Sequence, residues 1–348
     1  MSLRRPGRLT ACLAAGVAGL AVVPAVAQAG ATSYTRCDDA PGTTYVGTAR
    51  VGCSAVGEVA AAVGAAQTPA GELSALEAAG WTPMRALPVG RTGSSHDLIA
   101  VRGRGALRIR RVGTSPSLDG WSAGRELVLS RSTIVGGRPI PRDAAFCTSA
   151  FLVRQKSGAL AGLSAAHCGG LRSDGRVQRR NVALRRPPQP GVVLGRVLQI
   201  LTRRLPLDAL LVPASRATSR TATAVVDRGI RKPPLPVVGS ARTLSGRRVC
   251  FTGRTSGADQ CGRIRGSVAR PLESLFALQG LVVRCTTIRA REGDSGGPVY
   301  TAPGSDGAVR AVGIVTLISG PQALMCFTPV RPVLDALDAR LVVASPSS

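Results

Sequence analysis

The chain is poor in histidine and in aromatic residues, and both shortages restrict what it can do. Only two histidines, His96 and His167, occur in 348 residues, and no two cysteines have Cys-x-x-Cys spacing, so a zinc site is not expected. Aromatic residues make up 3% of the chain and are not interleaved with its arginines, which argues against specific nucleic-acid binding. Beyond the first 30 residues no run approaches the roughly 20 apolar residues of a membrane-spanning helix.

Acidic residues are also scarce. The 45 basic side chains, nearly all arginine, outnumber 19 acidic ones, and the net charge is +26. A charge of this size predicts adhesion to anionic surfaces such as cell-wall polymers, and this adhesion should weaken as the salt concentration rises.

The first residues have the three parts of a secretory signal peptide. Three arginines among the first eight residues precede an apolar run over residues 11–26, which ends at Ala27-Gln28-Ala29. A charged region, an apolar region and a small-residue cleavage site in this order are typical of a signal that is removed on export. We therefore expect residues 1–29 to be a signal peptide and the mature protein to be secreted and extracellular.

The cysteine count fits an exported protein, because disulfides persist in oxidising compartments. Removal of Cys12 with the signal leaves eight of the nine cysteines. Eight cysteines allow 105 pairings, so the sequence alone does not fix their connectivity. Pairing each cysteine with its nearest neighbour in order gives Cys37–Cys53, Cys147–Cys168, Cys250–Cys261 and Cys285–Cys326.

Residues 291–298 read Arg-Glu-Gly-Asp-Ser-Gly-Gly-Pro and place Ser295 between glycines. Glycine permits the tight backbone angles of an exposed turn. The N–H groups around such a serine can point to the spot where negative charge would develop if its oxygen attacked a carbonyl. A serine nucleophile needs a base, and His167, in the motif Ser-Ala-Ala-His-Cys, is the candidate.

The two motifs, in this order, resemble the trypsin/chymotrypsin family of serine endopeptidases, and within it the secreted bacterial, streptogrisin-like branch. The resemblance covers the chain from about residue 134 to its C-terminus. It implies an all-β catalytic domain of two antiparallel six-stranded β-barrels with a C-terminal helix, and no cofactor or metal. It also implies a Cys147–Cys168 disulfide and a bridge from near the serine to the following strand, which Cys285–Cys326 fits.

Asp208 lies in the apolar run of residues 205–212, where a carboxylate is costly unless it is hydrogen-bonded. A histidine N–H is one suitable partner, and the resemblance maps Asp208 onto the third member of a catalytic triad. It implies that Ser295 attacks a peptide carbonyl and forms an acyl-enzyme, with His167 moving the proton and Asp208 orienting His167. The N–H groups of Gly293 and Ser295 would form the oxyanion hole.

Three residues bear on substrate specificity through the resemblance. Arg289 stands where trypsin-like relatives place the acidic residue that binds basic side chains, so cleavage after Lys or Arg is not expected. Ile318 stands where a glycine opens the pocket, and Thr316 is expected to keep its hydroxyl near Asp208. We predict cleavage after small or medium apolar residues, with cleavage after acidic residues through Arg289 as the rival.

The chain divides into residues 30–130 and a protease-like domain of residues 131–348. In the first region, residues 70–79 are predicted to be a helix and residues 98–101 and 106–110 strands, which indicates a small α+β unit. This region is either a pro-region that assists folding or blocks the site, or a permanent accessory domain. His96, in a polar stretch, is expected to be a loop histidine.

Ile134-Val135-Gly136-Gly137 resembles the N-terminus that trypsin-like zymogens expose, whose freed amine pairs with the aspartate before the serine, here Asp294. Thr133, not a basic residue, precedes it, so a trypsin-like activator would not cut there. We expect instead self-cleavage, an internal arginine paired with Asp294, and a domain that begins near this motif.

The apolar pattern predicts a hairpin of residues 147–153 and 159–165 that leads to His167, and a helix over residues 330–341. The sequence as a whole predicts a monomeric secreted serine endopeptidase that acts on proteins or peptides. The alternative is a catalytically weak or inactive protein of the same fold that binds at a cell surface.

Overall fold

The computed structural model describes residues 33–89, 95–113, 120–134, 141–170, 177–185, 192–197, 199–200, 207–214, 219, 222–229, 232–265, 282–319 and 323–344. The expected signal peptide and residues 135–140 lie outside these ranges. Among the helices of the described residues, none has the length and apolar character needed to cross a membrane.

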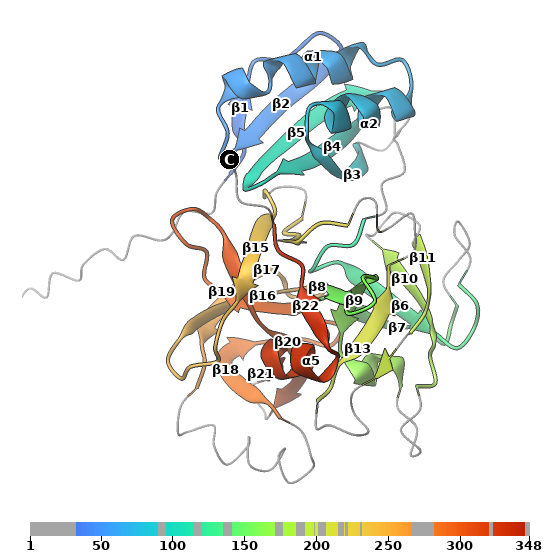
Figure 1. Ribbon diagram of the computed structural model, residues 1–348, viewed down its shortest axis with the longest axis vertical. Coiled ribbons are helices and arrows are strands. Elements are labelled where there is room, and N and C mark those ends of the chain that lie inside the picture. Colours follow the sequence, from blue (N-terminus) through green and yellow to red (C-terminus); the bar gives the residue numbers. More distant parts are fainter. Residues whose placement is uncertain are drawn as a thin grey trace, which may run out of the picture. The chain divides into compact units, whose positions relative to one another are not determined.

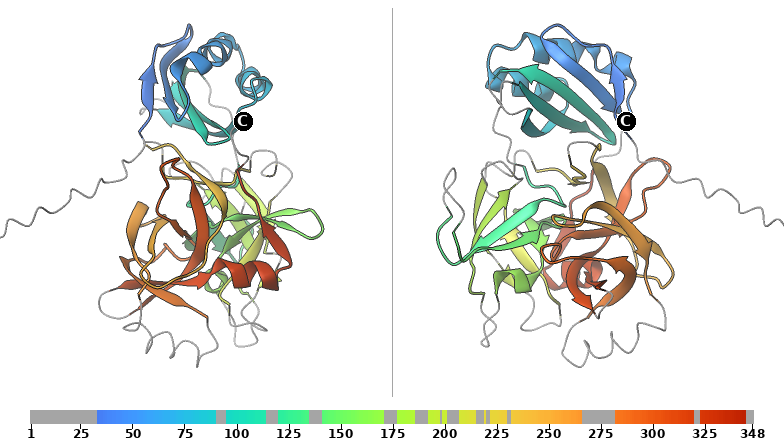
Figure 2. Two further views of the ribbon diagram at one scale, coloured as in Figure 1. Left: turned by 60° about the vertical axis from the view of Figure 1, so that its left-hand side comes forward. Right: turned by 180° about the vertical axis from the view of Figure 1, so that it is seen from behind.

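Residues 33–113 form an antiparallel sheet with two helices on one face (Figures 1 and 2). Thr68 caps the second helix by accepting a hydrogen bond from the Gly71 N–H at 3.1 Å, and Gly80, with φ of +74°, follows its end. The sheet order is β1-β2-β5-β4-β3. The elements are β1 (Thr35–Cys37), β2 (Thr43–Ala49), α1 (Gly57–Ala65), α2 (Pro69–Ala78), β3 (Thr82–Val89), β4 (Ser95–Arg102) and β5 (Gly105–Val112).

His96 is not a loop residue, contrary to the sequence prediction. It lies on β4 with no exposed surface. Its Nε2 is 2.8 Å from Glu72 Oε2 on α2, and its Nδ1 is 3.3 Å from the carbonyl oxygen of Gly113. The His96 ring can be buried because these two groups satisfy both of its nitrogens, so the residue serves the packing of this region.

Residues before 131 pair with strands that follow the Ile134 motif. Strand β6 (Glu126–Ser130) lies in a sheet between β10 (Asn181–Arg185) and β7 (Ala145–Thr148). Before it, the fully buried Trp121 donates its indole N–H to the Ala150 carbonyl at 3.0 Å. The leucines of this strand pack in one core cluster with Cys147 and Cys168, which favours a domain start before the Ile134 motif.

This part is mostly β, and its described strands group into sheets of four, five and eight, among which two six-stranded barrels are not confirmed. The first half holds the sheets β11-β10-β6-β7 and β12-β13-β9-β8-β22, and the second half holds the eight-stranded sheet. The two halves lie side by side (Figure 1). One pair, β15 with β20, is parallel, contrary to the expected all-antiparallel barrels. The remaining strands are β8 (Leu152–Gln155), β9 (Leu160–Ser164), β11 (Val192–Arg196), β12 (Gln199–Ile200), β13 (Leu210–Pro213), β14 (Val225–Val226), β15 (Leu235–Ser240), β16 (Arg248–Gly253), β17 (Gly257–Arg263), β18 (Arg284–Arg289), β19 (Pro298–Thr301), β20 (Val309–Ser319), β21 (Leu324–Pro329) and β22 (Ala339–Leu341).

The C-terminal helix is shorter than predicted. Helix α5 spans Val330–Ala336, and the chain then forms β22, which pairs with β8 of the first half. Asp338 has a φ of +46°, which no helix continues through. Leu337 and Leu341 still pack on the core cluster between the halves, so helical spacing there reflects burial rather than a continuous helix.

Candidate active site

His167 lies at the end of the β8–β9 hairpin, in a short 3₁₀ turn over Ala166–Gly169. The neighbouring Cys168 forms a disulfide with Cys147 on β7, which fixes the turn to the sheet. The imidazole Nδ1 is 2.6 Å from Asp208 Oδ2, and the backbone N–H of His167 donates to Asp208 Oδ1 at 2.9 Å. Both carboxylate oxygens of Asp208 therefore hold the same residue.

Asp208 precedes β13, which pairs with β9, so the sheet brings it beside His167. The Asp208 side chain is 5% exposed, whereas that of His167 is 43% exposed. Burial lowers the pKa of the His167 imidazole, but the hydrogen bond and the charge of Asp208 outweigh burial and raise this pKa above its ordinary value. His167 is thus an accessible imidazole with increased basicity.

Ser295 lies in a tight turn that packs on the same part of the fold. Its carbonyl accepts a hydrogen bond from the Thr148 N–H at 2.8 Å, and the Cys168 sulfur is 3.9 Å from the same oxygen. A Cβ on Gly296, which has a φ of +84°, would lie 2.1 Å from the Ser164 hydroxyl, so only glycine fits this close approach. Ser295 therefore lies next to the residue that follows His167.

The described contacts include no hydrogen bond between the Ser295 hydroxyl and the His167 imidazole. In unliganded sites such bonds are often long and shorten only when substrate binds. Among the described residues, the N–H groups of Gly293 and Ser295 also have no acceptor. Two donors beside a serine hydroxyl are what an oxyanion needs.

Asp294 is fully buried and, among the described residues, is not paired with an arginine side chain, contrary to the sequence prediction. Oδ1 accepts the N–H groups of Thr255 and Ser256, at 3.0 and 2.9 Å, and Oδ2 accepts the Ser256 hydroxyl and the Arg291 N–H at 2.8 Å. Four donors offset the cost of burying this charge. We call residues 254–256 the Asp294 loop.

The three residues predicted to set specificity differ in their environments. Arg289, on β18, and Ile318, on β20, are exposed. Ile318 is opposite Met325, which is fully buried, so both side chains are on one face of the sheet. The Thr316 hydroxyl bonds to Thr328 Oγ1 at 2.6 Å and donates to the Ile314 carbonyl of its own strand at 3.2 Å.

The cysteines form Cys37–Cys53, Cys147–Cys168, Cys250–Cys261 and Cys285–Cys326. These are the pairs of nearest neighbours in sequence. In the described part of the chain, no group of three histidine, cysteine, aspartate or glutamate side chains could hold a metal ion.

Sequence reasoning missed the residues that support the serine turn: Thr148, Thr255, Ser256 and Glu126. Their contacts with the turn or with the Asp294 loop join residues whose separation in the sequence ranges from 37 to 145 positions. No local motif signals such contacts, although Thr148 follows a cysteine that the family resemblance had already placed near His167.

The structure is similar to solved bacterial chymotrypsin-like serine proteases. Protease A of Thermobifida fusca is 24% identical with a TM-score of 0.42, over 61% of this chain and 100% of that one. The Nocardiopsis protease is 24% identical with a TM-score of 0.41, over 60% of this chain and 99% of that one. Cellulomonas bogoriensis chymotrypsin is 22% identical with a TM-score of 0.40, over 64% of this chain and 97% of that one. No protein-family model and no curated protein matches the chain. Because these TM-scores are low, we infer the function from the residues of the site.

Proposed function

We propose that residues 120–344 form a serine endopeptidase that hydrolyses peptide bonds through Ser295, His167 and Asp208. The observation that carries this proposal is the hydrogen bond between His167 Nδ1 and the accepting Asp208 Oδ2. It leaves Nε2 of an accessible imidazole as the proton acceptor on the side of the ring away from Asp208. The placement of Ser295 beside Cys168 and the two unused N–H groups of its turn support the same function.

In this mechanism His167 Nε2 removes the proton from the Ser295 hydroxyl as its oxygen attacks the substrate carbonyl. The carbonyl oxygen becomes negatively charged and accepts hydrogen bonds from the N–H groups of Gly293 and Ser295. His167 then donates its proton to the departing amine, which leaves an acyl-enzyme on Ser295. Water attacks the acyl group by the same steps, and Asp208 stabilises the charged imidazole throughout.

We further propose that the protein acts outside the cell, since the expected signal peptide and four disulfides suit an oxidising compartment. Protein or peptide substrates are expected to be cut after small or medium apolar residues, because Ile318 stands where the family resemblance places the glycine that opens the specificity pocket. Cleavage after acidic residues, bound by the exposed Arg289, is the rival. The net charge of +26 favours adhesion to anionic cell-wall polymers.

Hydrolysis of a peptide library by the purified protein tests both activity and specificity. The wild type should cleave, and Ser295→Ala and His167→Ala should each lose nearly all activity while remaining folded. Arg289→Ala should leave apolar cleavage in place, whereas loss of the main cleavage products with this variant would favour the acidic specificity. A folded wild type that cleaves nothing would support a non-catalytic binding protein instead.

A further inference from the structure

Gly293 lies between two peptide groups that must be oriented correctly for the oxyanion hole. Its N–H belongs to the peptide that joins it to Glu292, and its carbonyl to the peptide that joins it to Asp294. With a φ of +93°, Gly293 uses a conformation that glycine enters easily but also leaves easily. The orientation of its N–H therefore depends on what holds the two neighbouring peptides.

Two threonine hydroxyls hold them, one on each side. The Thr255 hydroxyl donates to the Glu292 carbonyl at 2.7 Å, and the Thr148 hydroxyl donates to the Gly293 carbonyl at 2.9 Å. In a trans peptide the N–H points away from the carbonyl. The bond from Thr255 to Glu292 therefore directs the Gly293 N–H to the opposite side, away from the Asp294 loop.

Thr148 is a buried junction of this arrangement. Its hydroxyl also accepts the Arg254 N–H at 3.0 Å, its own N–H donates to the Ser295 carbonyl, and its carbonyl accepts the Ser164 hydroxyl at 2.9 Å. One side chain thus contacts both the Asp294 loop and the turn that carries the serine.

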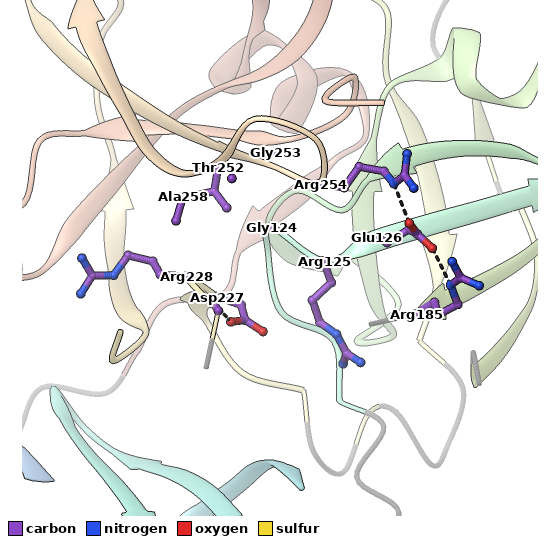
Figure 3. A pocket seen from close by; sticks show the side chains of 12 residues that line it. Gly124, Arg125, Glu126, Arg185, Asp227, Arg228, Thr252, Gly253, Arg254 and Ala258 are labelled. Atoms are coloured by element: carbon purple, nitrogen blue, oxygen red, sulfur yellow. Dashed lines mark hydrogen bonds and ion pairs between the residues drawn. The ribbon is translucent and has the colours of Figure 1, made fainter. Parts of the chain in front are cut away.

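The Asp294 loop is itself fixed to the first half of the domain. Arg254 Nε donates to Glu126 Oε2 at 2.6 Å, and Arg185 Nε donates to Glu126 Oε1 at 2.5 Å (Figure 3). The Glu126 side chain is 2% exposed, and the Arg254 guanidinium lies over the Phe146 ring, 4.9 Å from its centre. Two arginines offset the buried charge of Glu126, so the loop that contains Thr255 is held in place.

We propose that Thr148 and Thr255 are positioning residues that hold the oxyanion-hole turn of Gly293 in its working conformation within the uncut chain. The partners of both threonine hydroxyls are backbone groups of the serine turn and of the Asp294 loop. The four donors to Asp294 come from Thr255, Ser256 and Arg291, so no freed N-terminal amine is needed. The inference rests on the proposed protease function. It adds that the hole depends on two hydroxyl groups that act through the backbone carbonyls of Glu292 and Gly293.

The test compares Thr148→Val and Thr255→Val with Thr148→Ser and Thr255→Ser. Valine keeps the branched shape and removes the hydroxyl, whereas serine restores it. For each variant, kcat and KM on a peptide substrate and the inhibition constant of a peptide trifluoromethyl ketone are measured, because the ketone adduct places an oxyanion in the hole. Loss of a complete oxyanion donor lowers kcat by about 10²–10³-fold.

Each valine variant should lower kcat by about 10-fold or more and weaken the ketone by a similar factor, with KM little changed, and the serine variants should recover most of the loss. Thr255 is exposed, so its valine variant decides the matter if Thr148→Val fails to fold. Valine variants with wild-type kcat and ketone affinity would overturn the inference while the protease function stands. A folded wild type without hydrolysis or ketone binding would overturn both.

Discussion

At the scale of single residues, the basicity of His167 is the property most open to measurement. Asp208 raises the pKa of this imidazole above its ordinary value of 6.5. The base must be neutral to accept the Ser295 proton, so activity is lost as the pH falls through the raised pKa. We predict that kcat/KM rises with pH through an inflection above pH 6.5.

The Asp208→Asn variant is the matched control for this prediction. An asparagine lacks the charge that raises the imidazole pKa, while the burial that lowers this pKa remains. The inflection should move to lower pH, and kcat should fall by about 10⁴-fold because the tautomer is no longer fixed. An inflection at the same pH in both proteins would show that Asp208 does not control His167.

At the scale of elements, the carboxylate of Asp143 holds the end of β6 through hydrogen bonds. Asp143 accepts the Ser130 hydroxyl at 2.8 Å and the Arg131 N–H at 2.6 Å, and these bonds lower the pKa of Asp143 to about 2. A lowered pKa in the folded state means that the stabilisation is present above the unfolded value of 3.8 and is lost as the pH falls toward 2.

We therefore predict that Asp143→Asn unfolds at a lower temperature than the wild type at about pH 6, and that this difference disappears near pH 2. Thermal melts at a series of pH values measure it. Asp335→Asn on α5 is a suitable control, because it removes the charge of an exposed carboxylate. A difference that stays constant across this pH range would contradict the role given to Asp143.

The elements around the site differ in how well the sequence predicts them. Asp208 was predictable because a carboxylate in an apolar run needs a partner. The hairpin before His167 was predictable from two apolar runs separated by a polar turn, although its first strand, β8, begins at Leu152 and not at residue 147. Thr148 and the Asp294 loop were not, because their contacts with the serine turn join distant segments. Residues 337 and 341 fitted a helical period because both are packed on the core, but the chain there turns and pairs as β22.

At the scale of the whole molecule, the start of the protease-like part determines which processed forms can remain folded. Trp121 is buried beneath Gly162, and β6 is hydrogen-bonded on both sides. A cut at the Ile134 motif followed by release of the preceding residues would remove a strand, the buried indole and Glu126. We predict that every active form begins upstream of Trp121, whether the region before Trp121 is a pro-region or a permanent domain.

N-terminal sequencing of active, secreted protein tests this prediction. A truncated chain that begins at Ile134 should fail to fold, and one that begins at Gly120 should keep the His167–Asp208 site if the preceding region is not needed for folding. An active protein that begins at Ile134 would contradict the assignment of β6 to the domain.

The activation of Ser295 is tested most directly by the reaction of the secreted protein with a serine-reactive fluorophosphonate, followed by intact-mass analysis beside Ser295→Ala. We expect one adduct on the wild type and none on the variant, at a mass that still includes Trp121. A folded wild type that forms no adduct, or an adduct that persists on Ser295→Ala, would show that Ser295 is not a nucleophile activated by His167 and Asp208.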